Sequence, residues 1–165
     1  MDAIFTRNSV RKFTDEMPTE EQIERLLRAA MAAPSAKNQQ PWEFFIVTNE
    51  ECLVKLSEAT PYSMCVKNAR IAFVLASRRD GLNAPQYRDI NMGIASENIL
   101  LELEALGLGG VMIGVSPIPE NMEHVRSALN MPETLIPFTI IPFGYPAKKR
   151  PLEDRYDASR VHRVK

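Results

Sequence analysis

The longest periodic segment in this sequence of 165 residues, at positions 87–106, has apolar residues on more than one side of the helix that it would form. These residues are Ile90, Ile94, Ile99, Leu100, Leu103 and Leu106. A helix at a protein surface usually has one apolar stripe, whereas a helix that is apolar over much of its circumference is normally covered by other elements. The sequence therefore predicts a long helix at the centre of the fold.

Shorter helix and strand patterns surround this segment without a strict alternation of the two. Residues 19–33 are typical of a helix, because Thr19 and Gln22 have the spacing of a capping box and apolar residues follow at helical intervals. Other helices are expected at residues 2–7, 50–59 and 119–130, and strands at residues 42–49, 71–77, 111–115 and 135–146. Such a mixture favours an α+β fold, in which helices pack on one mainly antiparallel sheet. The length suits a single domain over residues 1–165.

The residues of two expected strands favour different positions in the sheet. Residues 42–49 are mostly apolar, so we expect both faces of that strand to be covered. Residues 135–146 contain Pro137 and Pro142, and proline removes a hydrogen-bond donor from the ladder. We therefore expect the last strand to be irregular or to lie at an edge of the sheet.

Single residues predict where one helix begins and where another ends. Asp2 is expected to cap the first short helix, whose Ile4 and Phe5 would provide apolar contacts. The run "GLGG" at residues 107–110 follows a helix and precedes a strand, which is the reverse of the order in a dinucleotide-binding loop. We interpret Gly107 as the end of the central helix.

The cations of the chain balance its anions, with 20 Lys and Arg residues against 21 Asp and Glu residues and a net charge of −1. Nucleic-acid-binding domains usually carry a basic surface, so this balance argues against a nucleic-acid partner. Three cations nevertheless gather near the N-terminus, namely Arg7, Arg11 and Lys12. Because the positive charge is local, any anionic partner should be small.

The cysteines, the histidines and the apolar runs argue against several other classes of protein. Cys52 and Cys65 are too few for a disulfide framework, and we expect two reduced thiols with Cys65 buried. His124 and His162 are isolated, which argues against a metal site. The N-terminus lacks the apolar run of a secretory signal, and no stretch approaches the roughly 20 apolar residues of a membrane span. We therefore expect a cytoplasmic protein without a membrane partner.

A polar loop joins the helix at residues 19–33 to the next strand. After Pro34, which ends the helix, it contains Ser35, Lys37, Asn38, Gln39 and Gln40. We expect these side chains at the surface. Short polar groups between rigid elements are common in ligand-binding loops, although an ordinary helix-to-strand loop has the same composition. On these residues alone the ordinary loop is the favoured interpretation.

Four stretches of the sequence resemble one family, the FMN-dependent nitroreductases. They are "RNSVRKF" at residues 7–13, "APSAKNQQPWEF" at residues 33–44, "ENILLELEALGLGGVMIG" at residues 97–114 and "FGYPAKK" at residues 143–149. They occur in the order in which the family has them and extend over nearly the whole chain. The resemblance implies an α+β fold built as an intertwined homodimer, with two FMN molecules in the interface that each contact both subunits.

The resemblance also implies roles for residues of the first stretch. Arg7 and Ser9 would hold the phosphate and the ribityl chain of FMN, since a guanidinium can donate two hydrogen bonds to phosphate oxygens. Arg11 would lie at the pyrimidine edge of the flavin, where a cation stabilises the negative charge of the reduced ring. Asn8 stands where the family usually has a basic residue, so its contact with FMN departs from the family pattern.

Residues of the other stretches would complete the cofactor site. Some would come from the partner subunit and border the flavin, and others would follow the central helix and lie beside the N5 atom. The tail would supply a cation to the phosphate; without such a ligand, its composition is that of a disordered C-terminus. The residues are Pro34, Ser35, Ala36 and Asn38 of the partner; Gly114, Val115 and Ser116 beside N5; and Arg155 at the phosphate, with Lys149 and Arg150 as alternatives.

The activity that the resemblance implies is that of a flavin oxidoreductase. NADH or NADPH would reduce FMN, and a small conjugated acceptor such as a nitroaromatic or a quinone would reoxidise it in a ping-pong cycle. No catalytic side chain is required, because the flavin performs the chemistry; Glu97 and Asn98 would only hold the central helix to neighbouring backbone. The alternatives are a flavin-dependent reductive dehalogenase, with a lid formed by residues 61–67 or 78–89, and a flavin-binding protein without turnover.

Overall fold

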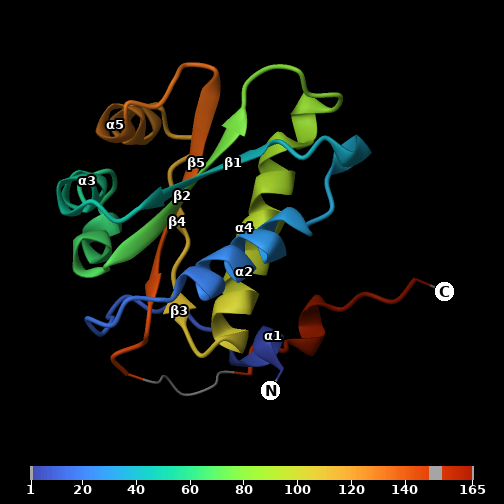
Figure 1. Cartoon of the computed structure of the whole chain (residues 1–165). Coiled ribbons are helices and arrows are strands. Elements are labelled where there is room, and N and C mark those ends of the chain that lie inside the picture. Colours follow the sequence, from blue (N-terminus) through green and yellow to red (C-terminus); the bar gives the residue numbers. More distant parts are fainter. Residues whose placement is uncertain (1, 149–153, 165) are drawn as a thin grey trace.

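The computed structural model describes residues 2–148 and 154–164, and its body is an antiparallel sheet with helices on both faces (Figure 1). In these residues the strand order is β1-β2-β5-β3, and β4 also pairs with β5. The strands are β1 (Trp42–Val47), β2 (Ile71–Arg78), β3 (Gly109–Gly110), β4 (Ile113–Gly114) and β5 (Leu135–Gly144). Each of these pairings is antiparallel, which confirms the predicted α+β class.

Helices cover both faces of the sheet. In Figure 1, α2 (Glu20–Met31) and α4 (Arg88–Ala105) lie on one face, whereas α3 (Glu50–Leu56) and α5 (Pro119–Leu129) lie on the other. The short α1 (Ala3–Thr6) lies near the C-terminal end of α4. Short 3-10 turns are η1 (Ala36–Asn38), η2 (Ser63–Asn68), η3 (Pro85–Tyr87) and η4 (Ala158–Arg160). None of the helices in the two described ranges has both the length and the apolar character that crossing a membrane requires.

The hydrophobic core has two parts, one on each face of the sheet, and β2 contributes to both. Ile71, Phe73 and Leu75 belong to the cluster under α2 and α4, whereas Ala72 and Val74 belong to the cluster under α3 and α5. Alternate residues of a strand face opposite sides of a sheet, so a strand that is covered on both faces has to be apolar throughout. β2 is covered on both faces, which explains its continuous apolar run.

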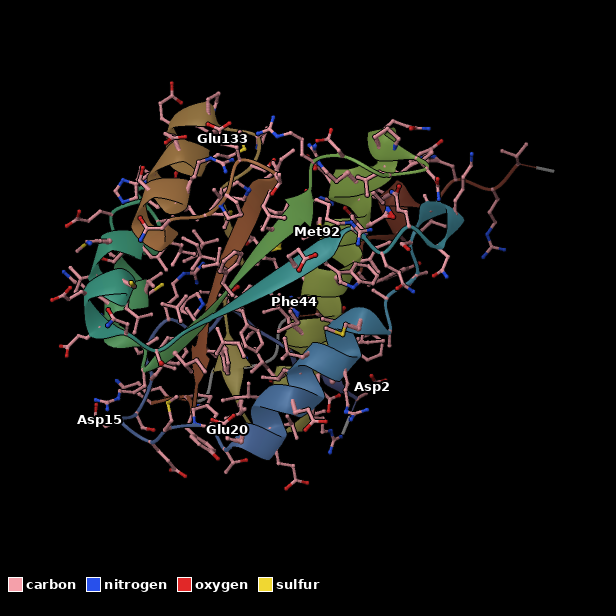
Figure 2. All side chains as sticks on the ribbon, turned by 45° about the horizontal axis from the view of Figure 1, so that its top comes forward. Asp2, Asp15, Glu20, Phe44, Met92 and Glu133 are labelled. Atoms are coloured by element: carbon pink, nitrogen blue, oxygen red, sulfur yellow. The ribbon has the colours of Figure 1, made fainter. Side chains whose placement is uncertain are left out.

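The long helix α4 is central, as its sequence predicts. Met92, Ile99 and Leu103 are fully buried in the cluster that α4 forms with α2 and the sheet. Figure 2 shows Met92 on α4 and Phe44 on β1, and both belong to this cluster. Ile90, by contrast, is 60% exposed. In the single chain, α4 therefore keeps an apolar surface outside the core that it forms.

Local sequence signals fix the ends of two helices. The backbone N–H of Gln22 donates to Thr19 Oγ1 at 3.2 Å, and the backbone N–H of Thr19 donates to Gln22 Oε1 at 2.9 Å. These two bonds confirm the predicted capping box of α2. After α4, Gly107 has a φ of +72°, a left-handed conformation that glycine adopts without steric cost. Its predicted position at the end of the helix is also confirmed.

The structure corrects the predicted positions of two strands. β1 lies at an edge of the sheet, and Ile46 is 47% exposed, so the two faces of β1 are not both covered. β5, which we expected to be irregular or to lie at an edge, lies between β2 and the short strands β3 and β4. The edge position is therefore wrong, whereas a register shift in its pairing with β2, next to Pro137, confirms the irregularity. Pro142 is tolerated there because it lies between the residues that pair with β3 and those that pair with β4, where the ladder is interrupted.

The first helix also differs from its prediction. The side chain of Asp2 forms no cap, and Ile4 and Phe5 are 66% and 74% exposed instead of packed. A four-residue helix is too short to be stable by itself and depends on tertiary packing. Because α1 buries none of its own residues, its position depends on its contacts with α4 and on the contacts of the residues that follow it.

Candidate functional site

The N-terminal cationic stretch lies along one edge of the sheet. The backbone N–H of Val10 donates to the carbonyl of Gly110 at 2.9 Å, and Ser9 forms a parallel bridge with Gly110. This bridge places Ser9 and Val10 next to Gly110, in the segment that follows α4 and continues to residues 114–116. The first and the third of the family-like stretches therefore meet in the same chain.

Beyond this bridge the same edge of the sheet is open. The backbone N–H groups of Val111 and Val115 donate to carbonyls of β5 at 3.4 and 3.0 Å. Hydrogen-bonding groups of successive residues in a strand point to alternate sides, so the main-chain groups of Met112 and Gly114 point away from β5. We call the main chain of residues 112–114 the open edge.

The open edge has room for a ligand at Gly114. A Cβ atom built on Gly114 would meet no heavy atom within 4 Å, and the residue is exposed. Ser116 is partly exposed and donates from Oγ to Asp89 Oδ2, in the first turn of α4, at 3.4 Å. Val115 is buried in the core below. Of the three residues predicted beside N5, Gly114 and Ser116 are therefore accessible to a ligand, whereas the side chain of Val115 is not.

Arg7 lies against the long helix α4. Its Nε is 3.2 Å from Glu97 Oε1, and the side chains of Arg7 and Glu97 are 22% and 50% exposed. We expected Glu97 to bind backbone, and this prediction is wrong because Glu97 pairs with a side chain. Asn98 does bind backbone, donating from Nδ2 to the carbonyl of Ala29 of α2 at 2.9 Å. Arg7 stays partly accessible, and a guanidinium has five N–H donors, so it can still bind an anion.

Asn8 and Arg11 have different surroundings on the same stretch. Asn8 Nδ2 donates to the carbonyl of Thr6 at 3.4 Å, whereas its Oδ1 is buried without a hydrogen-bond partner among the described residues. Most buried acceptors are paired, so this oxygen marks an incomplete polar site. Arg11 is exposed and lies close enough to Cys65 of η2 to lower the pKa of that thiol, although burial has the larger effect and raises the pKa of Cys65.

The polar loop after α2 is strained and firmly attached. Left-handed φ angles of 52°, 51° and 42° occur at Lys37, Asn38 and Gln40. This conformation costs a non-glycine residue about 1 kcal/mol or more, and it persists only where the surroundings enforce it. Ser35 Oγ accepts a hydrogen bond from the backbone N–H of Gln40 at 3.0 Å, and the backbone N–H of Ala36 donates to Asn91 Oδ1 of α4 at 2.7 Å. Pro34 is exposed at the start of the loop.

Gln39 corrects the expectation that all polar side chains of this loop lie at the surface. It is 5% exposed, its Nε2 donates to the carbonyl of Ala84, and its Oε1 accepts from the N–H of Ala84, both at 2.9 Å. Arg78 Nη2 also donates to the carbonyl of Gln39 at 2.7 Å. Gln39 therefore fastens the loop to a segment that is distant in sequence, which explains why no local pattern indicated its burial.

The polar loop and the open edge lie on different sides of α4. Ser116 contacts Asp89, whereas Ala36 contacts Asn91. Successive residues of a helix are about 100° apart, so two side chains that are two positions apart point about 200° apart. In Figure 1 the loop before β1 lies at one end of α4 and α1 lies at the other. Among its described residues, one chain thus joins the cationic stretch to the open edge but not to residues 34–38.

The predicted phosphate cations of the tail are only partly described. Lys149 and Arg150 lie outside the described residues, whereas Arg155 is described and exposed. All residues from 154 to 164 are exposed, and Figure 1 shows this segment running past α1 and away from the sheet. Asp157 accepts hydrogen bonds from the hydroxyl and the backbone N–H of Ser159, which hold the pKa of its carboxyl below the ordinary value. The tail therefore has local order without joining the core.

A family model and several curated proteins are similar to this chain. The model of the "Nitroreductase family" matches residues 4–78 and 61–145. A candidate NADH dehydrogenase/NAD(P)H nitroreductase of Methanothermobacter thermautotrophicus is 41% identical over 162 residues, which are 98% of this chain and 85% of that protein. A more distant relative, an iodotyrosine deiodinase of Thermotoga neapolitana, is 29% identical over 88% of this chain and 87% of its own length.

Solved structures of similar proteins agree with the fold. A candidate NADH oxidase of Clostridium acetobutylicum superposes with a TM-score of 0.96 at 39% identity, over 99% of both chains. A candidate nitroreductase of Desulfovibrio desulfuricans, solved in complex with FMN, superposes with a TM-score of 0.84 at 27% identity, over 99% of this chain and 95% of that one. The fold class that the sequence motifs implied is thereby confirmed.

Proposed function

This chain belongs to the nitroreductase family, and from that premise we propose that it is an FMN-dependent oxidoreductase. When bound, FMN would take hydride from NADH or NADPH at N5 and pass it to a conjugated acceptor such as a nitroaromatic or a quinone. Similar proteins are described as candidate NAD(P)H nitroreductases and NADH oxidases, and one similar structure contains FMN. These relatives support the cofactor and the electron donor, and the acceptor is proposed from the chemistry of flavins.

The observation that carries this proposal is the cationic stretch beside the open edge. FMN has an anionic phosphate and a flat ring, so its site needs positive charge and a surface that the ring can approach closely. Arg7 and Arg11 supply the charge, and Gly114 has no side chain to keep a ring away from its part of the open edge. The Oδ1 of Asn8, which has no hydrogen-bond partner in residues 2–148 and 154–164, is an acceptor that suits a hydroxyl of the ribityl chain.

In this proposal the side chains bind and orient the cofactor and transfer no proton. Arg7 and Ser9 hold the phosphate end, because a guanidinium offers a planar set of donors to phosphate oxygens. Arg11 lies at the ring, where its positive charge favours the reduced flavin. Ser116 and the main chain of Gly114 border the ring on the side of the sheet. Arg155 of the tail adds positive charge at the phosphate of FMN.

A second copy of the chain would complete the site with residues 34–38. The polar loop and the open edge lie on different sides of α4, so one chain does not present both to one ligand. The large apolar side chains of Phe5, Ile90 and Tyr156 are 74%, 60% and 75% exposed, and packing against a second copy would bury them. A homodimer in which each FMN contacts both subunits satisfies both requirements.

Reductive dehalogenation is a second candidate for the acceptor chemistry. The similarity to an iodotyrosine deiodinase favours it, and Tyr62 in the segment 61–67 is 81% exposed, so it is available to cover an aromatic substrate. In this reaction a carbon–hydrogen bond replaces the carbon–halogen bond, halide leaves, and NAD(P)H supplies the electrons. Halide release from an iodophenol in step with NAD(P)H oxidation would support it. Turnover of nitroaromatics without any halide release would rule it out.

Anaerobic mixing of the FMN-loaded protein with NADH, and separately with NADPH, tests the proposed function. We expect at least one nicotinamide to bleach the yellow flavin absorbance, and a nitroaromatic or a quinone to restore it. Flavin that stays yellow with both donors would leave only a flavin-binding protein without turnover. A purified protein that is colourless and takes up no FMN would overturn every flavin-based function.

A further inference from the structure

We propose that Glu97 is a positioning residue, which holds the guanidinium of Arg7 in place for the FMN phosphate. The inference rests on the proposed function, because it takes Arg7 as a phosphate contact. It starts from the ion pair in which Arg7 Nε lies 3.2 Å from Glu97 Oε1. Glu97 begins the third of the family-like stretches, but the sequence predicted no contact between this carboxylate and the cofactor site.

The N-terminal segment gives Arg7 little support of its own. α1 has four residues, buries none of them, and exposes Ile4 and Phe5. The backbone N–H of Arg7 donates to the carbonyl of Ala3 at 2.9 Å, which is a contact within the same short helix. An arginine side chain also has many rotamers, and their loss opposes binding. A partner on a rigid element is therefore needed to preorganise this guanidinium.

α4 is such an element at the position of Glu97. The preceding residue, Ser96, is fully buried and donates from Oγ to the carbonyl of Met92 at 2.8 Å. The following residue, Asn98, donates to the carbonyl of Ala29 in α2 at 2.9 Å. The carboxylate of Glu97 thus extends from a fixed backbone. Its closest approach is to Arg7 Nε, and the terminal nitrogens of a guanidinium carry four further N–H donors that can bind a phosphate.

The same carboxylate also repels a phosphate, so the two effects of Glu97 have opposite signs. The side chain of Glu97 is 50% exposed, and solvent and salt weaken the repulsion across the guanidinium. The direct contact with Arg7 is weakened less, because Arg7 is only 22% exposed. We therefore expect positioning to outweigh repulsion. If Glu97 instead competed with the phosphate for Arg7, its removal would tighten FMN binding.

The test compares the affinity of Glu97 variants for FMN and for riboflavin, which lacks the phosphate. The dissociation constant of FMN is measured by the rise of flavin fluorescence when the FMN-loaded protein is diluted. We expect Glu97→Ala to weaken FMN binding about fivefold, the upper end for a partly exposed ion pair, with no change for riboflavin. Glu97→Gln should restore most of the affinity, because its amide oxygen can occupy the place of the carboxylate oxygen beside Arg7 Nε.

Glu102→Ala is the matched control. Glu102 lies on the same helix but pairs with Arg25 of α2 and not with the cationic stretch, so its removal should leave FMN affinity unchanged. Unchanged or tighter FMN binding in Glu97→Ala would overturn the inference, as would an equal loss of FMN and riboflavin. The proposed function fails separately, if the unmodified protein binds no FMN. If Arg7→Ala weakens FMN binding while Glu97→Ala does not, only the inference fails.

Discussion

The two polar stretches of the proposed cofactor site, residues 34–40 and residues 7–11, are held in place in opposite ways. The loop at residues 34–40 is fastened by buried hydrogen bonds from Gln39 to Ala84 and keeps three left-handed residues. The N-terminal stretch is attached by the main-chain bond between Val10 and Gly110 and by an ion pair at Arg7. One stretch is fixed by buried side-chain hydrogen bonds, whereas the other is fixed by one main-chain bond and one partly exposed ion pair.

This difference indicates how the cofactor site gains its affinity. A stretch that is rigid before binding loses little conformational entropy when the ligand binds. A stretch that is held by a partly exposed ion pair loses more, because the ligand orders it further. Changes in the loop should therefore reduce the stability of the fold, and changes in the N-terminal stretch should reduce binding. The following predictions test this contrast.

Gln39→Ala should have the largest effect. It removes two buried hydrogen bonds and leaves the N–H and the carbonyl of Ala84, which is 2% exposed, without these partners. We expect the free energy of unfolding to fall by about 2–4 kcal/mol, measured by denaturant titration. The exposed Gln86→Ala is the control and should change stability by less than about 0.5 kcal/mol. Equal effects of the two variants would contradict the anchoring role of Gln39.

Arg7→Ala should show the reverse pattern. Loss of a charge-assisted contact with phosphate should weaken FMN binding by about 1.5–3 kcal/mol, measured as the dissociation constant. The free energy of unfolding should change by no more than about 1 kcal/mol, because the pair with Glu97 is partly exposed. Unchanged FMN affinity would refute the phosphate role of Arg7, and a large loss of stability would remove the contrast with Gln39.

Arg11→Ala should act on the flavin ring more than on binding. Removing a cation from the pyrimidine edge destabilises the reduced flavin, so the reduction potential should fall. We expect a shift on the order of 30 mV, which equals about 1.4 kcal/mol for a two-electron couple, with a smaller loss of FMN affinity than in Arg7→Ala. Lys12→Ala, an exposed neighbour, is the control for charge at a distance. An unaltered potential would count against Arg11 at the ring.

Lys37→Gly tests the strain in the rigid loop. Lys37 has a φ of 52°, which glycine adopts without steric cost, so this substitution should leave the free energy of unfolding unchanged or raise it by up to about 1 kcal/mol. Lys55→Gly in α3 is the matched control and should lower it by about 1 kcal/mol, because glycine weakens a helix. Thermal unfolding of both variants gives the comparison. A destabilised Lys37→Gly variant would show that the loop is not under strain.

The smallest effect concerns Cys65, beside the N-terminal stretch. Burial raises the pKa of its thiol above the ordinary value of 9.0, and Arg11 opposes this shift only in part. In a Cys52→Ser background, the alkylation rate of Cys65 should therefore rise with pH to a midpoint above 9.0. The raised pKa favours the folded state below pH 9.0, and this contribution is lost as the pH rises through the folded pKa. A midpoint below 9.0 would contradict the burial of this thiol.

Interactions over a few consecutive residues could be predicted from the sequence. The capping box of Thr19 and Gln22, the left-handed end of α4 at Gly107 and the buried strand β2 are encoded by neighbours in the chain, because caps and periodicity act over one or two turns. The motif order also predicted the family and the α+β fold, which the comparisons confirm. The contacts of the site residues with FMN stay predictions.

Pairing between distant segments was decided by the tertiary structure alone. β5 lies inside the sheet although it contains Pro142, because the break between β3 and β4 leaves room for a residue without an N–H. Gln39 is buried and Glu97 meets Arg7 because the fold brings together groups that no local pattern relates. Caps and apolar periods depend on neighbours along the chain, whereas strand order and polar partners depend on which surfaces meet in space.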